Sequence, residues 1–358
     1  MAFVTLEKSS LKQNYDFLDK LFKKHNIEWA PVVKMLCGNE LYLEYILSLG
    51  NEQICDARLS NLKVIKELKP ETETIYIKPP AKNSIEEVVK YADVSFNSEF
   101  VTIKWLSDEA KRQNKTHRIL IMIELGDLRE GIMGESLMDF YQKVFDLPNI
   151  EVAGIGSNLN CLSGVMPSKD KLIQLSLYEQ LIEAKFGKKI NGVSGGSSVM
   201  VPLLLKGMVP EGVNHFRIGE TLFFGVDLFS NTTIEGMRDD VFKLNAEIIE
   251  VTEKPVSPYG DLDENPSGEK FEIKEEDFGQ VHKRGILDIG LLDVAKPDFL
   301  NPTDENINFI GASSDMLVMD LSKTEKEYKV GDIVSFKMDY MGALRVMNSQ
   351  YIEKRLVE

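Results

Sequence analysis

The feature that most constrains the fold is a regular alternation of short apolar runs with amphipathic segments over residues 1–228. In amphipathic segments such as SIEEVVKYA, apolar residues recur at positions i, i+3, i+4 and i+7, a spacing typical of helices. Strands that alternate with helices form βαβ units and a parallel sheet. The pattern therefore predicts a (β/α)8 TIM barrel, with a doubly wound open sheet as the alternative. The apolar runs are residues 30–34, 53–57, 74–78, 93–97, 118–124, 152–158, 190–194 and 214–219.

The pattern changes after residue 228. Segments such as LNAEIIEVTEKPVSPYG and GDIVSFKM are strand-like and are separated by glycine, proline and acidic residues. No good helical run occurs until the end of the chain. We therefore expect residues 1–228 to form the barrel and residues 229–358 to form a C-terminal all-β domain.

Composition narrows the class of protein. With 43% hydrophobic and 28% charged residues, the chain is typical of a soluble globular protein. Its net charge of -15 disfavours nucleic acid as a partner. The three cysteines and four histidines show no metal-ligand spacing, so no metal site is expected. No run approaches the roughly 18 apolar residues of a membrane span, and the first 25 residues lack a signal-peptide core, so we expect a cytoplasmic location and no membrane partner.

One lysine ends the first apolar run. In the stretch WAPVVKMLCGN, Lys34 follows five mostly apolar residues. The C-terminal ends of barrel strands form the functional face, so Lys34 is expected at the barrel mouth. A neutral amine there can attack a carbonyl to form a Schiff base. A solvated strand-end lysine is the plainer alternative.

Two later strand ends are suited to an anion. VSGGSSVM follows the seventh run, and its glycines and serines can cradle a phosphate; an ordinary serine-capped turn is the alternative. HFRIGETLFFG ends the eighth run and offers the backbone amides of Gly219 and Glu220, while His215 fits a structural role better than a catalytic one. Phosphate sites after strands seven and eight recur in barrels. MIELGDLREGIMG ends the fifth run, where Arg129 could recognise a carboxylate or form a surface ion pair.

These stretches together resemble the alanine racemase-like family of pyridoxal phosphate enzymes over nearly the whole chain. VVKMLCGN is similar to that family's cofactor-lysine stretch, SGGSS to its phosphate turn and RIGETLFFG to its arginine stretch. PVSPYGD resembles its catalytic tyrosine segment, and GASSDMLVMDL a late stretch of its β domain. Within the family, VVKMLCGN, SGGSS, RIGE and GASSDM look closest to the ornithine racemases.

The resemblance implies specific roles. Lys34 would carry pyridoxal 5'-phosphate and act as a base on one face of the substrate, and Tyr259 of the partner subunit would act on the other. Arg217 would face the pyridine nitrogen. The family thus implies a homodimer with composite active sites. The remaining implied assignments are Ser197, Ser198, Gly219 and Glu220 at the phosphate, Asn158 at the cofactor ring, and Arg129, Ser314 and Asp315 at the substrate.

The sequence departs from the family at three of its positions. Asn158 stands where alanine racemases usually have a histidine, and Gly38 where many relatives have a phosphate-binding tyrosine. Met122 replaces a modified lysine that positions the loop arginine in some relatives.

The resemblance favours ornithine as the substrate. Asp261, Asp263, Glu264 or Asp315 could pair with its side-chain ammonium, although an acidic loop is usually only solvated. Racemisation of lysine, alanine or a broad range of amino acids is the alternative. A decarboxylase on the same two-domain plan and a non-catalytic pyridoxal phosphate carrier are further alternatives.

Overall fold

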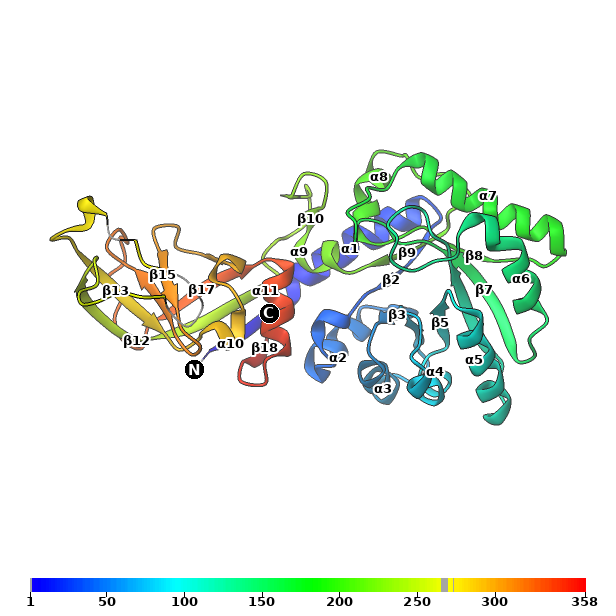
Figure 1. Cartoon of the computed structure of the whole chain (residues 1–358), viewed down its shortest axis with the longest axis horizontal. Coiled ribbons are helices and arrows are strands. Elements are labelled where there is room, and N and C mark those ends of the chain that lie inside the picture. The colour runs from blue at the N-terminus through cyan, green and yellow to red at the C-terminus, as the bar shows by residue number, and fades with distance from the viewer. Residues whose placement is uncertain (1, 265–269, 273) are drawn as a thin grey trace. The chain divides into compact units, whose positions relative to one another are not determined.

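The computed structural model describes residues 2–264, 270–272 and 274–358. The chain divides into two compact units (Figure 1). The barrel unit comprises Glu7–Val241 together with the C-terminal Glu358, and the β unit comprises the N-terminal residues through Leu6 and Phe242–Val357.

The barrel unit is built on eight parallel strands that follow one another in the order β2-β9-β8-β7-β6-β5-β4-β3. A parallel bridge between Val32 and Cys55 joins the two ends of this order, so the sheet closes. The structure therefore confirms the TIM barrel over the open sheet. The strands are β2 (Glu28–Pro31), β3 (Gln53–Asp56), β4 (Glu73–Tyr76), β5 (Val94–Asn97), β6 (His117–Met122), β7 (Ile150–Gly156), β8 (Gly192–Ser194) and β9 (His215–Ile218).

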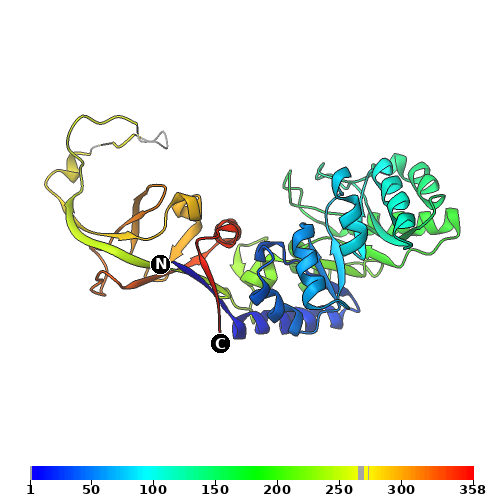
Figure 2. The same cartoon turned by 90° about the horizontal axis from the view of Figure 1, so that it is seen from below.

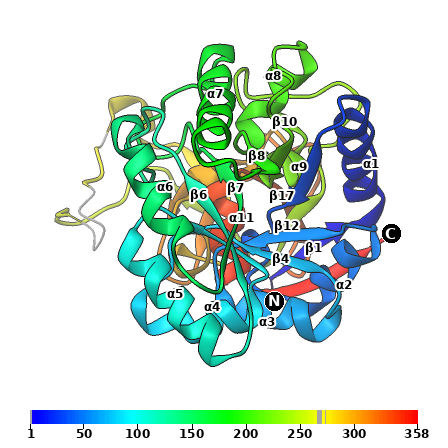
Figure 3. The same ribbon diagram turned by 90° about the vertical axis from the view of Figure 1, so that its right-hand side faces the viewer.

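Helices surround these strands, as the view onto this unit in Figure 3 shows. Their apolar faces follow the expected spacing; in the first helix Leu11, Leu18 and Phe22 are buried. No helix among the described residues is long and apolar enough to cross a membrane. The helices are α1 (Lys8–Lys24), α2 (Glu40–Ser48), α3 (Leu59–Leu68), α4 (Ile85–Tyr91), α5 (Phe100–Arg112), α6 (Leu137–Phe145), α7 (Lys169–Phe186), α8 (Val201–Leu205) and α9 (Glu220–Phe224).

The barrel interior contains an apolar cluster. Alternate residues of the strands form one buried cluster, which includes Val32, Cys55, Phe96, Leu120 and Met122. Because successive side chains of a strand point to opposite faces, the members of this cluster identify which residues of each strand point into the barrel. The residues after the strand ends then form the rim where the candidate site lies.

The β unit is an antiparallel sheet centred on the long strand β12 (Phe242–Pro255), the curved yellow-green strand of Figure 2. β12 pairs with β1, β13 and β17. The unit also contains α10 (Leu291–Val294) and α11 (Tyr340–Asn348). Its other strands are β1 (Phe3–Glu7), β13 (Val281–Leu287), β14 (Leu300–Pro302), β15 (Asn308–Ala312), β16 (Leu317–Asp320), β17 (Ile333–Met338) and β18 (Glu353–Val357).

The boundary between the units differs from the one expected after residue 228. The barrel unit continues to Val241 through the short hairpin of β10 (Val226–Asp227) and β11 (Thr232–Thr233). The chain also begins with a strand, β1, which pairs with β12 and so belongs to the β unit. The partners in this pairing are far apart in the sequence, so no local pattern reveals it.

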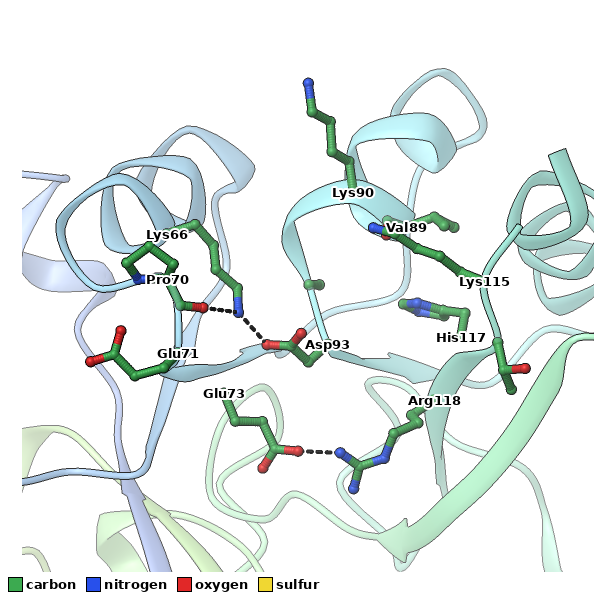
Figure 4. Close-up of a pocket in the computed structure, with 12 residues that line it drawn as sticks. Lys66, Pro70, Glu71, Glu73, Val89, Lys90, Asp93, Lys115, His117 and Arg118 are labelled. Carbon is green, nitrogen blue, oxygen red and sulfur yellow. Dashed lines mark hydrogen bonds and ion pairs between the residues drawn. The ribbon is translucent and has the colours of Figure 1, made fainter. Parts of the chain in front are cut away.

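A surface pocket of about 430 Å³ lies at the opposite ends of the strands, where β4, β5 and β6 begin (Figure 4). Ion pairs cross it: the Lys66 Nζ lies 2.6 Å from an Asp93 carboxylate oxygen, and Arg118 pairs with Glu73. Polar features at the N-terminal ends of barrel strands usually serve stability rather than catalysis. We therefore assign these pairs to closing the base of the barrel.

Candidate functional site

Lys34 lies at the end of β2, at the C-terminal rim of the barrel. It begins a short 3-10 helix, Lys34–Leu36, and is not the last residue of the strand as expected. Val33, Met35 and Leu36 are buried around it, while Lys34 itself is exposed. The following turn has left-handed backbone angles at Cys37 (φ 52°) and Gly38 (φ 74°). The amine is therefore presented to the rim from a turn that is anchored by its apolar neighbours.

Ser198 joins the turns that follow β8 and β9. Its Oγ accepts hydrogen bonds from the backbone N–H groups of Gly219 and Thr221, each at 3.1 Å. Gly196 has φ 139°, and a methyl group there would lie 2.9 Å from Met200, so the turn requires glycine. The structure thus brings Ser198 and Gly219 together as expected. The second donor to Ser198 is the backbone N–H of Thr221, one residue beyond Glu220, and the sequence did not indicate it.

Arg217 is buried inside the barrel below these turns, with 3% of its surface exposed. Its guanidinium donates to the Ser194 Oγ at 2.5 Å, to the Ser157 carbonyl at 2.9 Å and to the Asn158 Oδ1 at 3.5 Å. It also lies over the Phe96 ring, 5.1 Å from the centroid. Burial lowers the pKa of Arg217 to about 10, which still leaves it protonated at neutral pH. Arg217 and Asn158, predicted on separate strand ends, are in contact.

A chain of hydrogen bonds continues from Arg217 into the barrel. The His215 Nδ1 lies 2.7 Å from the Ser194 Oγ, and its Nε2 lies 3.1 Å from the Gln53 Oε1. An amide oxygen only accepts, so the hydrogen is on Nε2, and Nδ1 accepts from Ser194. Gln53 donates onward to a Glu73 oxygen at 2.5 Å.

His215 is therefore a neutral structural histidine, in agreement with the sequence-based interpretation. Its burial, with Arg217 nearby, lowers its pKa to about 3.

Arg129 lies in the loop after β6, and it pairs with the adjacent Glu130. Its Nη1 also contacts the Cys161 Sγ at 2.7 Å. Asp127 ties this loop to the one after β7, because its carboxylate accepts from several backbone N–H groups there, including that of Leu162 at 2.9 Å. The structure therefore shows the ion pair that the sequence left as the alternative role of Arg129. A substrate carboxylate would have to bind the Arg129 guanidinium together with Glu130.

The other predicted site residues belong to the β unit. Tyr259 is 92% exposed. Ser314 and Asp315 are exposed in the turn between β15 and β16, where a methyl group on Gly290 would lie 2.3 Å from the Ser314 carbonyl oxygen. Of the acidic run after Tyr259, the described carboxylates at positions 261, 263 and 264 are exposed, and residues 265–269 lie outside the described residues. These groups are on the surface of their unit.

Comparisons with known proteins agree with this geometry. The model of the family "alanine racemase, N-terminal domain" matches residues 6–227. The chain is 38% identical to the ornithine racemase of Acetoanaerobium sticklandii over 99% of both chains. It is 28% identical to the lysine racemase of Thermotoga maritima over 96% of this chain and 95% of that one. The alanine racemase of Bartonella henselae, solved with covalently bound pyridoxal phosphate, shares the fold, with a TM-score of 0.73 at 15% identity over 99% of each chain. The protein therefore belongs to the alanine racemase family.

Proposed function

We propose that this chain is a pyridoxal phosphate-dependent amino-acid racemase that interconverts L- and D-ornithine. The observation that carries the proposal is the 38% identity to an ornithine racemase, which extends over 99% of both chains. The lower identity to a lysine racemase makes lysine the second candidate substrate.

The barrel rim fits a phosphorylated pyridine aldehyde. Arg217 is a buried cation whose hydrogen bonds among the described residues go to neutral oxygens and not to a carboxylate, and a buried charge without a counter-ion is costly. The buried Ser157 Oγ and Asn97 Oδ1, at the ends of β7 and β5, also find no hydrogen-bond partner within the part of the chain that the structure describes. These are the features expected of a site that a polar ligand completes.

The residues would hold the group as follows. Lys34 would bind its aldehyde covalently, Arg217 would face its ring nitrogen, and Asn158 would contact the ring. The phosphate would lie at Ser197 and Ser198 and at the backbone amides of Gly219 and Glu220. When bound, pyridoxal phosphate supplies an electron sink for the charge that develops at the α-carbon.

The protein's own contribution is proton transfer and orientation. The Lys34 Nζ would take the α-proton on one face, and Tyr259 of the partner subunit would return a proton on the other. Arg217 keeps its proton and so does not protonate the ring nitrogen. Arg129 would orient the substrate carboxylate, with Ser314 and Asp315 of the partner subunit at the substrate.

This assignment requires a homodimer, because the barrel unit supplies Lys34 and the partner supplies Tyr259. We also propose a cytoplasmic location, which the free cysteines Cys37, Cys55 and Cys161 support.

Deuterium exchange tests the reaction. The reconstituted protein is incubated with L-ornithine in deuterated water. A racemase removes the optical rotation and exchanges the α-hydrogen, whereas a decarboxylase releases carbon dioxide. A panel that includes lysine and alanine then ranks the substrates, and a higher kcat/KM for any of them would overturn the assignment of ornithine.

A further inference from the structure

Lys34 has a carboxylate neighbour that the roles above do not use. The ends of β2 and β3 lie side by side, since Val32 bridges to Cys55 and the Val33 N–H donates to the Cys55 carbonyl at 2.9 Å. Asp56 is the last residue of β3, and Lys34 follows Val33 directly, three residues after β2 ends at Pro31. An amine and a carboxylate therefore leave two adjacent strand ends.

The Asp56 carboxylate is fully buried and is held by neutral donors. Its Oδ1 accepts from the Arg58 backbone N–H at 2.7 Å, and the Asn61 Nδ2 lies 3.2 Å from Oδ1 and 3.1 Å from Oδ2. Among the described residues, no cation forms an ion pair with it. A buried carboxylate is costly unless hydrogen bonds or a nearby cation stabilise it, and its field is screened less than that of a surface charge.

Asn61 also fixes the turn that carries Lys34. A methyl group on Gly38 would lie 2.8 Å from the Asn61 Oδ1, so the turn packs directly on this amide. Gly38 has φ 74°, a conformation that glycine adopts readily. One side chain thus contacts both the carboxylate and the turn, and this holds Asp56 and Lys34 in a defined relation.

The surroundings favour interaction with Lys34. Burial raises the pKa of Asp56 to about 6. The pKa is lowered by hydrogen bonds from the Asn61 side chain and from the backbone of Arg58 and Ala57, and by the charge of Lys34. Tyr76 at the end of β4 also faces this group; its pKa is raised by burial, lowered by Arg58 and raised by Asp56. The Asp56 carboxylate also acts on the buried thiol of Cys55. Asp56 is therefore ionised at pH 7 to 8, and the charge of Lys34 lowers the pKa of its carboxyl.

We propose that Asp56 is a positioning residue that stabilises the protonated form of the Lys34 amine, with Asn61 holding both in place. The inference rests on the role proposed for Lys34 as the base of a racemase. A base that takes a proton from carbon becomes an ammonium, and a fixed carboxylate nearby favours that state. Asp56 acts through Lys34 and does not touch the substrate.

The test measures Lys34 directly in the apoenzyme. Wild type and Asp56→Asn, which removes the charge and keeps the shape, are reductively methylated across a pH series, and modification of the Lys34 peptide is followed by mass spectrometry. We expect Lys34 of the variant to react about threefold faster or more at pH 7, because less of it is protonated. The matched control is Glu99→Gln, which removes one charge from the N-terminus of α5 and should leave the Lys34 curve unchanged. A folded Asp56→Asn protein with the wild-type curve would overturn the proposal.

A second variant keeps the test decisive if Asp56→Asn does not fold. Asn61→Ala removes the side-chain donor and favours the protonated carboxyl of Asp56. Its Lys34 should therefore react as in Asp56→Asn near pH 6 and as in wild type near pH 9. Wild-type behaviour at both pH values would contradict the coupling.

The two proposals can fail separately. If the cofactor attaches to a lysine other than Lys34, the proposed function is wrong. The dependence of Lys34 methylation on pH in the apoenzyme still tests its coupling to Asp56.

Discussion

Arg217 donates a hydrogen bond to the Ser194 hydroxyl inside the barrel, and Ser194 in turn donates to His215. This arrangement keeps His215 neutral and leaves Ser194 with no hydrogen to donate elsewhere. Gln53 and Glu73 continue this chain of hydrogen bonds behind His215.

The buried histidines predict a loss of stability in mild acid. The folded pKa values, about 4 for His117 and about 3 for His215, lie below the ordinary 6.5, so the unfolded chain binds more protons as the pH falls below about 6.5. The contribution of the two neutral histidines to the free energy of unfolding is complete above that pH. It is lost as the pH falls towards their pKa values in the folded state. At pH 5 each should lower the free energy of unfolding by about 2 kcal/mol.

Urea unfolding at pH 7, 6 and 5 measures this effect, and His117→Gln and His215→Gln should each flatten the profile. Asp56 acts in the opposite direction below about pH 6, since its folded pKa is raised. A profile that does not change when both histidines are replaced would contradict the assignment.

Ser198→Ala should weaken cofactor binding about tenfold. The variant removes the acceptor that organises the Gly219 and Thr221 amides, a loss of about 1 to 2 kcal/mol. Ser197→Ala is the matched control and should change the affinity less. Titration of the apoprotein with pyridoxal phosphate, followed by absorbance, gives both values; an unchanged affinity of Ser198→Ala would place the phosphate elsewhere.

Tyr259→Phe should abolish racemisation while cofactor binding is retained, because the substitution removes only the hydroxyl that would donate the proton. In a non-catalytic pyridoxal phosphate carrier, the substitution would leave function unchanged. Coexpression of Lys34→Ala with Tyr259→Phe distinguishes a site within one chain from a composite one. If Tyr259 acts in the partner subunit, each mixed dimer contains one intact site and regains activity. Mixed dimers as inactive as both parents would rule out the composite arrangement.

Arg129→Lys should raise KM for the amino acid about tenfold with a smaller effect on kcat. The planar guanidinium can bind Glu130 and a substrate carboxylate together, whereas an ammonium lacks that fork. Steady-state kinetics separate the two constants. An unchanged KM would assign Arg129 to loop structure alone.

The local pattern of the sequence predicted the eight barrel strands and the meeting of the turns that carry Ser198 and Gly219, because strand ends of a closed parallel sheet meet at one rim. Features that depend on distant residues were not visible. β1 pairs with β12, and Gln53 contacts His215, across separations that no short window contains. Lys34 was placed in a strand because the apolar run continues past the point where the backbone turns.

The central claim is that Lys34 binds pyridoxal phosphate covalently, and borohydride reduction tests it most directly. The reconstituted protein is reduced, digested and examined by peptide mass spectrometry. We predict an absorbance band at ~420 nm that disappears on reduction, and a pyridoxyl group on the peptide that contains Lys34. A modified peptide from another lysine, or no modified peptide at all, would contradict the account.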